Sequence, residues 1–236
     1  MKNQYFGDVN DYRKYGLLRV LSSPAGLSLG VAWMLTPDDG GTDGRLRRYL
    51  SEPQRWRHHD PELYTHLEEV LDNDAQPSVG LIERAAVLDH ATFFSDLVPD
   101  DSWGRASWAQ RMCNSMSGCD LVFLDPDNGF EVRSRPIGRT GSSKYAAWHE
   151  VEQLWGNASS VLVYQHYCRE RRDTFAHRLA DEMRARTGAS AVEGFSTPHV
   201  LFLLAIQPKH EARIRAAIDK GLWRWGGQIQ PVGLLG

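Results

Sequence analysis

Two carboxylates and an amide follow directly on a short apolar run near the middle of the chain. The segment DPDNG at residues 125–129 comes straight after LVFL at residues 121–124. Such a run predicts a buried strand, which the proline and glycine end at once. The polar side chains then lie at the carboxyl tip of a strand, where open α/β sheets bind ligands. Asp125, Asp127 and Asn128 are therefore candidate catalytic residues, and an ordinary Asp/Asn turn is the alternative.

A second apolar segment with a polar tip spans residues 160–167 and contains Gln165 and His166. If this strand is parallel and adjacent to the first, both side chains come near Asp125 and Asp127. A histidine beside carboxylates can act as a general base, so His166 joins the candidate catalytic residues. A packed residue at a strand end is the alternative interpretation.

The N-terminal run at residues 5–16 is dense in Asp, Lys, Arg and Tyr and precedes an apolar helix. Asp11 and Lys14 are three residues apart, so they share one face of that helix. We expect both in the wall of a cofactor pocket. The alternative is a helix N-cap at Asn10 or Asp11 together with a surface ion pair.

A polar turn, PDDGGTDG at residues 37–44, separates a predicted strand from a predicted helix that Asp43 would cap. A glycine-rich turn there can receive a nucleotide at the helix N-terminus. The turn matches neither GxGxxG nor GxxxxGK[ST], and its three aspartates would repel a phosphate. They would tolerate a ribose hydroxyl, an ammonium group or a metal ion; a plain surface turn is the alternative. The candidate cofactor-binding residues here are Thr36, Asp39, Gly40 and Gly41.

Periodicity predicts the elements that must position these side chains. Helices are expected at residues 12–21, 44–50, 61–71, 102–117, 142–155, 169–186 and 209–221. Strands are expected at residues 27–35, 121–124, 160–167, 189–195 and 199–206. Residues 78–97 fit either a strand followed by a helix or two short helices.

Strands alternating with helices indicate an α/β fold with a mostly parallel, Rossmann-like sheet and helices on both faces. The last two strands suit a C-terminal antiparallel hairpin, with one antiparallel strand near an edge. We expect a single domain over residues 1–236 with a helical insertion at about 53–100. The length of 236 residues and the 42% hydrophobic content are sufficient for one substantial core.

The bulk charge excludes a polycationic protein, because the formal net charge is −3. Any nucleic-acid partner would have to bind through local arginine patches. Two such patches are present, although each also fits a solvated helix face: Arg45, Arg47 and Arg48, and Arg169, Arg171 and Arg172.

Three cysteines without CxxC spacing argue against a zinc cluster or a disulfide framework. No apolar run approaches the length of a membrane span, and the N-terminus lacks the apolar region of a signal peptide. We therefore expect a cytoplasmic protein without a membrane partner. The oligomeric state stays open.

Residues 7–15, GDVNDYRKY, resemble the N-terminal GNHADVLKH segment of the bacterial adenine-N6 methyltransferases that modify large-subunit ribosomal RNA. Gly7, Asp11 and Lys14 match. Residues 121–129 are similar in place to the strand of that family that ends in DPPY, of which the first Asp and Pro are kept. The order of motifs resembles a class I S-adenosylmethionine-dependent methyltransferase, with its seven-stranded sheet and antiparallel last strand.

This resemblance implies S-adenosylmethionine as cofactor and a pocket shaped by Asp11 and Lys14. It also implies that Asp125 accepts a hydrogen bond from the target amine. The chain departs from the family where Asp127 and Asn128 replace the second proline and the aromatic residue of DPPY. It departs again at residues 38–41, where DDGG replaces the glycine loop.

Three functions remain open on the sequence. The first is a methyltransferase-like enzyme, acting on nucleic acid and needing no metal. The second is a metal-dependent phosphoesterase or nuclease, in which Asp125, Asp127 and Glu131 would bind Mg²⁺ or Mn²⁺ with Asn128 as a neutral ligand. The third is a non-catalytic module that binds nucleic acid or a protein.

Overall fold

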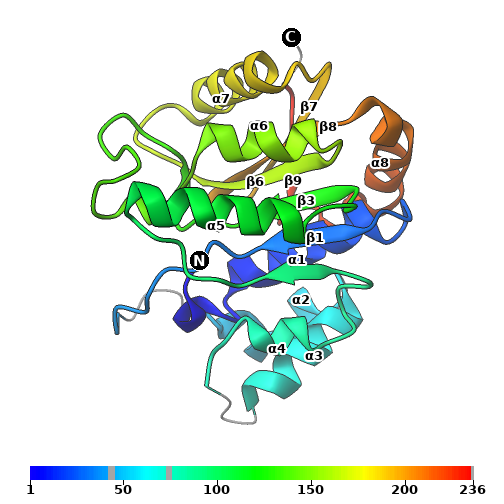
Figure 1. Cartoon of the computed structure of the whole chain (residues 1–236). Coiled ribbons are helices and arrows are strands. Elements are labelled where there is room, and N and C mark those ends of the chain that lie inside the picture. Colours follow the sequence, from blue (N-terminus) through cyan, green and yellow to red (C-terminus); the bar gives the residue numbers. More distant parts are fainter. Residues whose placement is uncertain (42–45, 73–75, 235–236) are drawn as a thin grey trace.

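A seven-stranded mixed sheet forms the centre of the molecule (Figure 1). The computed structural model describes residues 1–41, 46–72 and 76–234. The strand order is β2-β1-β3-β6-β8-β7-β9. The strands are β1 (Leu29–Ala32), β2 (Thr92–Phe94), β3 (Leu121–Leu124), β6 (Ser160–His166), β7 (Ala191–Ser196), β8 (Val200–Ile206) and β9 (Gln230–Val232). A separate ribbon pairs β4 (Gly129–Phe130) with β5 (Tyr145–Ala146).

The sheet is parallel on one side and antiparallel on the other. β1 pairs in parallel with β2 and β3, and β3 pairs in parallel with β6. β8 runs antiparallel to both β6 and β7, and β9 pairs antiparallel with β7. The predicted hairpin is thus confirmed, but β8 lies inside the sheet and the unpredicted β9 follows β7. All seven residues of β8 are apolar and buried, so this strand needs a neighbour on each side and a cover on both faces.

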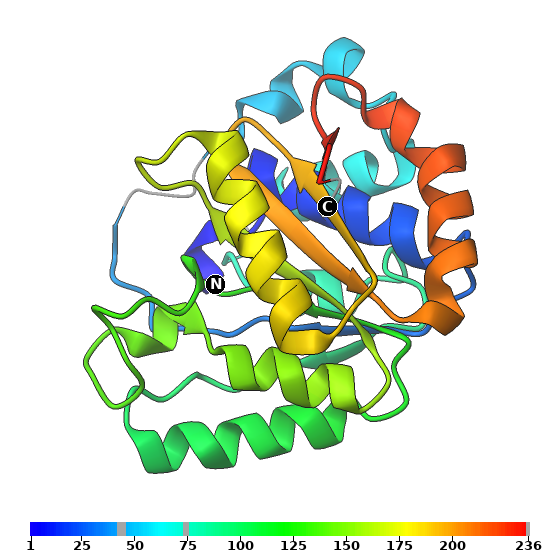
Figure 2. The same cartoon turned by 90° about the horizontal axis from the view of Figure 1, so that it is seen from above.

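Helices cover both faces of the sheet (Figure 2). α5 (Ser102–Ser115), α6 (Trp148–Gly156) and α7 (Arg172–Thr187) pack on one face. α1 (Val9–Ser22) and α8 (Pro208–Gly221) pack on the other, with α3 (Pro61–Asp72) against α1. The alternation along β3 follows this division, because Phe123 joins the core beside α1 while Val122 and Leu124 join the core beside α5.

The shorter elements lie mainly in the connections. They are α2 (Pro53–Trp56), α4 (Gly80–Glu83) and the 3₁₀ turns η1 (Asn3–Tyr5), η2 (Arg48–Ser51), η3 (Ser142–Lys144) and η4 (Leu222–Trp225). Of the expected insertion at 53–100, the first part is helical, whereas its later part supplies β2 to the main sheet.

Two predicted elements differ from the structure for identifiable reasons. Residues 78–97 form α4 and then β2, which is neither the expected strand and helix nor the expected pair of short helices, because β2 pairs with β1. The helix expected at 142–155 begins only at Trp148. Its first residues form η3 and β5 instead, since β5 pairs with β4 and the Glu150 carboxylate accepts the Ala147 N–H (2.9 Å), which starts the helix there. Tertiary pairing overrides the local helical pattern.

The remaining predicted helices and strands occur within a few residues of their expected ends, with one exception. The helix expected at 44–50 begins outside the described residues, and its last part is η2. Within the described chain, no helix is both long and apolar enough to cross a membrane.

Candidate functional site at the carboxyl ends of the strands

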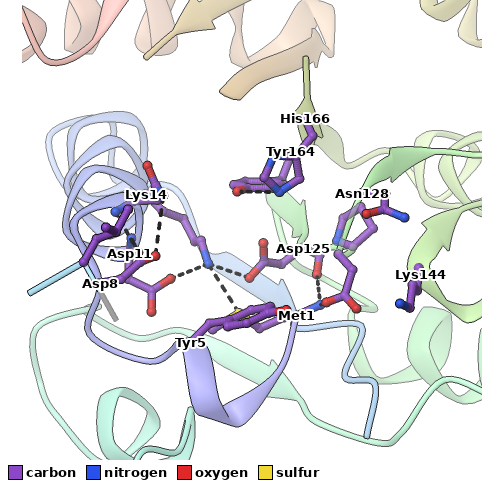
Figure 3. A pocket seen from close by; sticks show the side chains of 14 residues that line it. Met1, Tyr5, Asp8, Asp11, Lys14, Asp125, Asn128, Lys144, Tyr164 and His166 are labelled. Carbon is purple, nitrogen blue, oxygen red and sulfur yellow. Dashed lines mark hydrogen bonds and ion pairs between the residues drawn. The ribbon is translucent and has the colours of Figure 1, made fainter. Parts of the chain in front are cut away.

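A cavity of about 320 Å³ lies at the carboxyl ends of β3 and β6 (Figure 3). The chain continues from β1 to β2 on one side and reaches β3 on the other, so the sheet has its topological switch point between β1 and β3. Ligands of open α/β sheets bind at such a point. The lining residues are Met1, Tyr5, Asp8, Asn10, Asp11, Lys14, Leu46, Asp125, Pro126, Asp127, Asn128, Lys144, Tyr164 and His166.

Lys14 joins the start of α1 to the tip of β3. Its Nζ lies 2.7 Å from Asp11 Oδ1 and 2.7 Å from Asp125 Oδ2, and all three side chains are at most 3% exposed. Burial acts to lower the pKa of Lys14, but the two carboxylates outweigh it and raise the pKa above its ordinary value. The other oxygen of Asp11 accepts the Gly7 N–H at 2.9 Å. Lys14 is therefore a permanently charged bridge between two fixed carboxylates.

Asp125 is held at one oxygen and open at the other. Burial raises its pKa, and Lys14 and the Met1 amine oppose that rise. No hydrogen bond within the described chain engages Oδ1, and Asp125 lines the cavity. The arrangement leaves a carboxylate acceptor of fixed orientation at the cavity wall.

Asp127 anchors the N-terminal segment. Its Oδ1 lies 2.6 Å from the Met1 amine, and its Oδ2 accepts the Thr36 hydroxyl at 2.7 Å. The same amine donates to the carbonyls of Met34 and Asp125. Burial lowers the pKa of the amine, against the opposing effect of the two aspartates. Both oxygens of Asp127 are thus engaged, in contrast to those of Asp125.

Asp8 caps α1 and faces the same cavity. Its Oδ1 accepts the backbone N–H groups of Asn10 (2.7 Å) and Asp11 (2.9 Å), so the N-cap is Asp8 rather than the expected Asn10 or Asp11. Burial, with the nearby charge of Asp11, raises the pKa of Asp8 to about 7. Among the four lining aspartates, Asp8 is the one without an ion pair to any described residue.

The alternation of β6 sorts its last residues between two roles. Tyr164 and His166 line the cavity, with 3.3 Å between Tyr164 Oη and His166 Nε2. Gln165 instead accepts the Phe130 N–H (2.8 Å) and donates to the Asn128 carbonyl (3.1 Å), which fixes the loop after β3. Burial lowers the pKa of His166 and so favours the neutral imidazole. Tyr164 was missed from the sequence, although its spacing of two from His166 signals the same face.

The predicted cofactor loop separates into two parts. Thr36 is buried beneath the cavity and contacts Asp127. Asp39 forms an ion pair with Lys2, and the Gln4 amide donates to it at 2.9 Å. Asp39, Gly40 and Gly41 do not line the cavity. Through Asp39 this loop instead holds the N-terminal segment in place. The expected cap Asp43 lies outside the described residues.

The carboxylates proposed as metal ligands already have partners. Asp125 contacts Lys14, Asp127 contacts the Met1 amine, and Glu131 accepts the Trp148 N–H at 3.0 Å. In the part of the chain that the structure describes, no group of three or more His, Cys, Asp or Glu side chains is arranged to hold a metal ion. A cation bound through Asp127 would have to displace the Met1 amine or the Thr36 hydroxyl.

Two arginine-bearing loops adjoin cavity residues. One runs from residue 131 to Lys144, where it reaches the cavity, and the other follows His166. None of their exposed arginines forms an ion pair with a described residue. These side chains are Arg133, Arg135, Arg139, Arg169, Arg171 and Arg172. In the other predicted patch Arg48 pairs with Glu52, Arg47 donates to the Phe6 carbonyl, and Arg45 lies outside the described residues.

The sequence matches no protein-family model, and no curated protein matches it either.

Proposed function

We propose that this protein is an S-adenosylmethionine-dependent methyltransferase that acts on nucleic acid. The observation that carries the proposal is the cavity at the carboxyl ends of β3 and β6, with Asp125 held in its wall by Lys14. The residues on which the family resemblance rests converge there. Asp125 lies 111 residues from Lys14 in the sequence, yet the lysine bridges it to Asp11 with 2.7 Å to each carboxylate.

The sheet supports the same proposal. The resemblance implies seven strands with an antiparallel strand late in the chain. The sheet has seven strands, and the reversed β8 lies between β6 and β7. A fold alone does not define an activity, so the site residues bear the argument.

The chemical types of the side chains that line the cavity suit an adenosyl cofactor. Asp8, which lacks an ion pair within the described chain, would face a positive group of the cofactor or a ribose hydroxyl. Tyr5 and Tyr164 lie on opposite walls in Figure 3 and would offer flat surfaces for adenine. When bound, the cofactor supplies an electrophilic methyl group.

The chain's own residues would orient the acceptor. Asp125 Oδ1 would accept a hydrogen bond from the target amine, while Lys14 fixes the carboxylate through Oδ2. Asp11 acts as a positioning residue, because its own oxygens hold Lys14 and the Gly7 N–H. Methyl transfer depends on alignment in a site that excludes water, and this buried network supplies alignment.

The two arginine loops support a nucleic-acid substrate. Each meets the cavity at one end, and their arginines are exposed without carboxylate partners among the described residues. Such side chains would contact the phosphates of a nucleic-acid strand and hold it over the cavity whatever its base sequence.

Thermal melting of the full chain tests the proposal. S-adenosylhomocysteine or S-adenosylmethionine should raise the melting temperature, because a ligand of the native state stabilises it by mass action. Adenosine and Mg²⁺ or Mn²⁺, each alone, are the comparison ligands. A rise with metal and none with either adenosyl ligand would contradict the methyltransferase and favour the phosphoesterase.

A further inference from the structure

A second hollow of about 350 Å³ adjoins the cavity and shares Leu46 with it. We call it the arginine pocket. α1 separates the two, because Asn10, Asp11 and Lys14 line the cavity while Arg13 lines the arginine pocket. The polar and aromatic side chains that define the arginine pocket are Arg13, Arg48, Tyr49, Glu52, Arg55, Trp56 and His199.

Charge is unbalanced in the arginine pocket. Three guanidinium groups face it, and Glu52 is the carboxylate among its described lining residues. Glu52 forms ion pairs with Arg48 at 3.0 Å and with Arg55 at 3.5 Å. The lining therefore has an excess of two positive charges, and Arg13 has no carboxylate within ion-pair distance among the residues described.

Arg13 is a buried cation held by neutral groups. The residue is 5% exposed, and its Nε and Nη2 donate to Gln228 Oε1 at 3.2 and 2.7 Å. Its Nη1 reaches Asn10 Oδ1 at 3.4 Å. Burial lowers the pKa of Arg13 to about 10; the nearby Asp8 acts against this and Arg55 adds to it. A buried cation without a carboxylate at ion-pair distance is costly to keep, and an anion in the arginine pocket would offset that cost.

Trp56 brings two of the like charges together. The guanidinium carbons of Arg13 and Arg55 lie 5.3 and 5.5 Å from the centre of the Trp56 ring. Trp56 is itself 6% exposed, so its ring is a fixed surface. Arg13 and Arg55 are like charges beside one indole, and both line the arginine pocket, so an anion bound in the pocket would be attracted by both.

We propose that the arginine pocket is a binding site for a phosphate group. Guanidinium forks match phosphate oxygens in geometry, and the two excess charges match a phosphate dianion. His199 lines the same pocket and would add a ring nitrogen to its polar groups. This proposal is independent of the methyltransferase activity, because it concerns a separate set of residues and a different ligand.

Isothermal titration of inorganic phosphate into the full chain, at constant ionic strength, tests the proposal. We expect saturable binding that Arg55→Gln weakens about tenfold or more, the effect of losing a charge-assisted contact. Glu52→Gln should tighten binding several-fold, because it removes the competing carboxylate. The matched control is Arg57→Gln, an exposed arginine in the same segment that pairs with Glu68 and does not line the pocket.

Titrations of adenosine 5′-monophosphate and adenosine distinguish the sources of the phosphate. Tighter binding of the monophosphate than of phosphate, weakened by Arg55→Gln, would identify a nucleotide phosphate as the ligand. Binding of phosphate alone would identify the free anion. Absence of saturable phosphate binding, or equal affinities in the Arg55→Gln, Glu52→Gln and Arg57→Gln variants, would overturn the proposal.

Discussion

An aspartate stands at each end of β3, with Asp120 before the strand and Asp125 after it. Asp120 accepts the backbone N–H and hydroxyl of Ser28, both at 3.1 Å, and lies 3.1 Å from His210 Nε2. Desolvation acts to raise its pKa, but the bonds from Ser28 and the nearby His210 outweigh it and lower the pKa. At Asp125 burial prevails and the pKa is raised.

This difference shows that the same type of side chain has a structural role at one end of β3 and lines a cavity at the other. At the amino end both oxygens of Asp120 tie neighbouring segments together. At the carboxyl end one oxygen of Asp125 is fixed by Lys14 and the other is left for a ligand. Asp125 therefore retains an unfavourable burial that is outweighed at Asp120.

The largest expected effect comes from removing the cation at the carboxyl end. Lys14→Met leaves Asp11 and Asp125 buried together without their shared counter-charge, so the free energy of unfolding should fall by about 3–5 kcal/mol. Urea denaturation measures it. Lys144→Met is the matched control, because Lys144 lines the same cavity but is exposed; its effect should stay within about 0.5 kcal/mol. Equal effects of the two substitutions would contradict a buried bridge.

The two ends should also respond oppositely to pH. The folded pKa of Asp8, about 7, lies above its ordinary 3.8, so the folded state binds the extra proton between these values and stability falls as pH rises through them. The slope is at most about 1.4 kcal/mol per pH unit. Asp8→Asn keeps the N-cap and should remove this slope, making the variant more stable than the wild type above pH 7.

Asp120→Asn is the control for that experiment. The lowered pKa of Asp120 adds stability above its unfolded pKa, which is lost as the pH falls through the folded pKa. Its substitution should therefore destabilise the protein at neutral pH and matter less in acid. Denaturation curves between pH 3 and pH 8 measure both variants, and parallel curves for Asp8→Asn and the wild type would exclude a buried titrating Asp8.

A smaller effect is expected from the arginines of the carboxyl-end loops. Arg169→Gln with Arg171→Gln should weaken binding of a single-stranded oligonucleotide and lower its logarithmic salt dependence by about 1.4, or 0.7 for each lost phosphate contact. Fluorescence anisotropy over a salt series measures this. Arg178→Gln with Arg186→Gln removes the same charge from α7, where these arginines pair with Glu170 and Glu152. Equal salt slopes in the two double variants would contradict a nucleic-acid surface at this end of the sheet.

Much of the carboxyl-end site could be predicted from the sequence, because apolar runs that end in polar residues reveal strand tips. Asp125, Asn128 and His166 were found in this way. Asp11 and Lys14 followed from helical spacing and the family resemblance. The ion pair of Lys14 with Asp125 could not be predicted, since it joins residues 111 apart in the chain.

The misses have the same physical origin. Residues 142–147 look helical locally, but β5 forms because a partner strand is available. The glycine-rich turn after β1 suggested a cofactor loop. In the structure, its Asp39 carboxylate instead contacts Lys2 and Gln4. Asp8 was not among the predicted caps of α1, which were Asn10 and Asp11. Its lack of an ion pair depends on how the N-terminal segment lies across the strand tips, which no local pattern encodes.

The most direct test of the account is calorimetric titration of S-adenosylhomocysteine into the wild type, Asp8→Asn and Asp120→Asn at neutral pH. The account predicts saturable binding to the wild type, the same affinity in Asp120→Asn, and a loss of about tenfold or more in Asp8→Asn, as for a contact to a charged group. Absence of binding to the wild type, or equal affinity in all three proteins, would contradict an adenosyl site at the carboxyl end of β3.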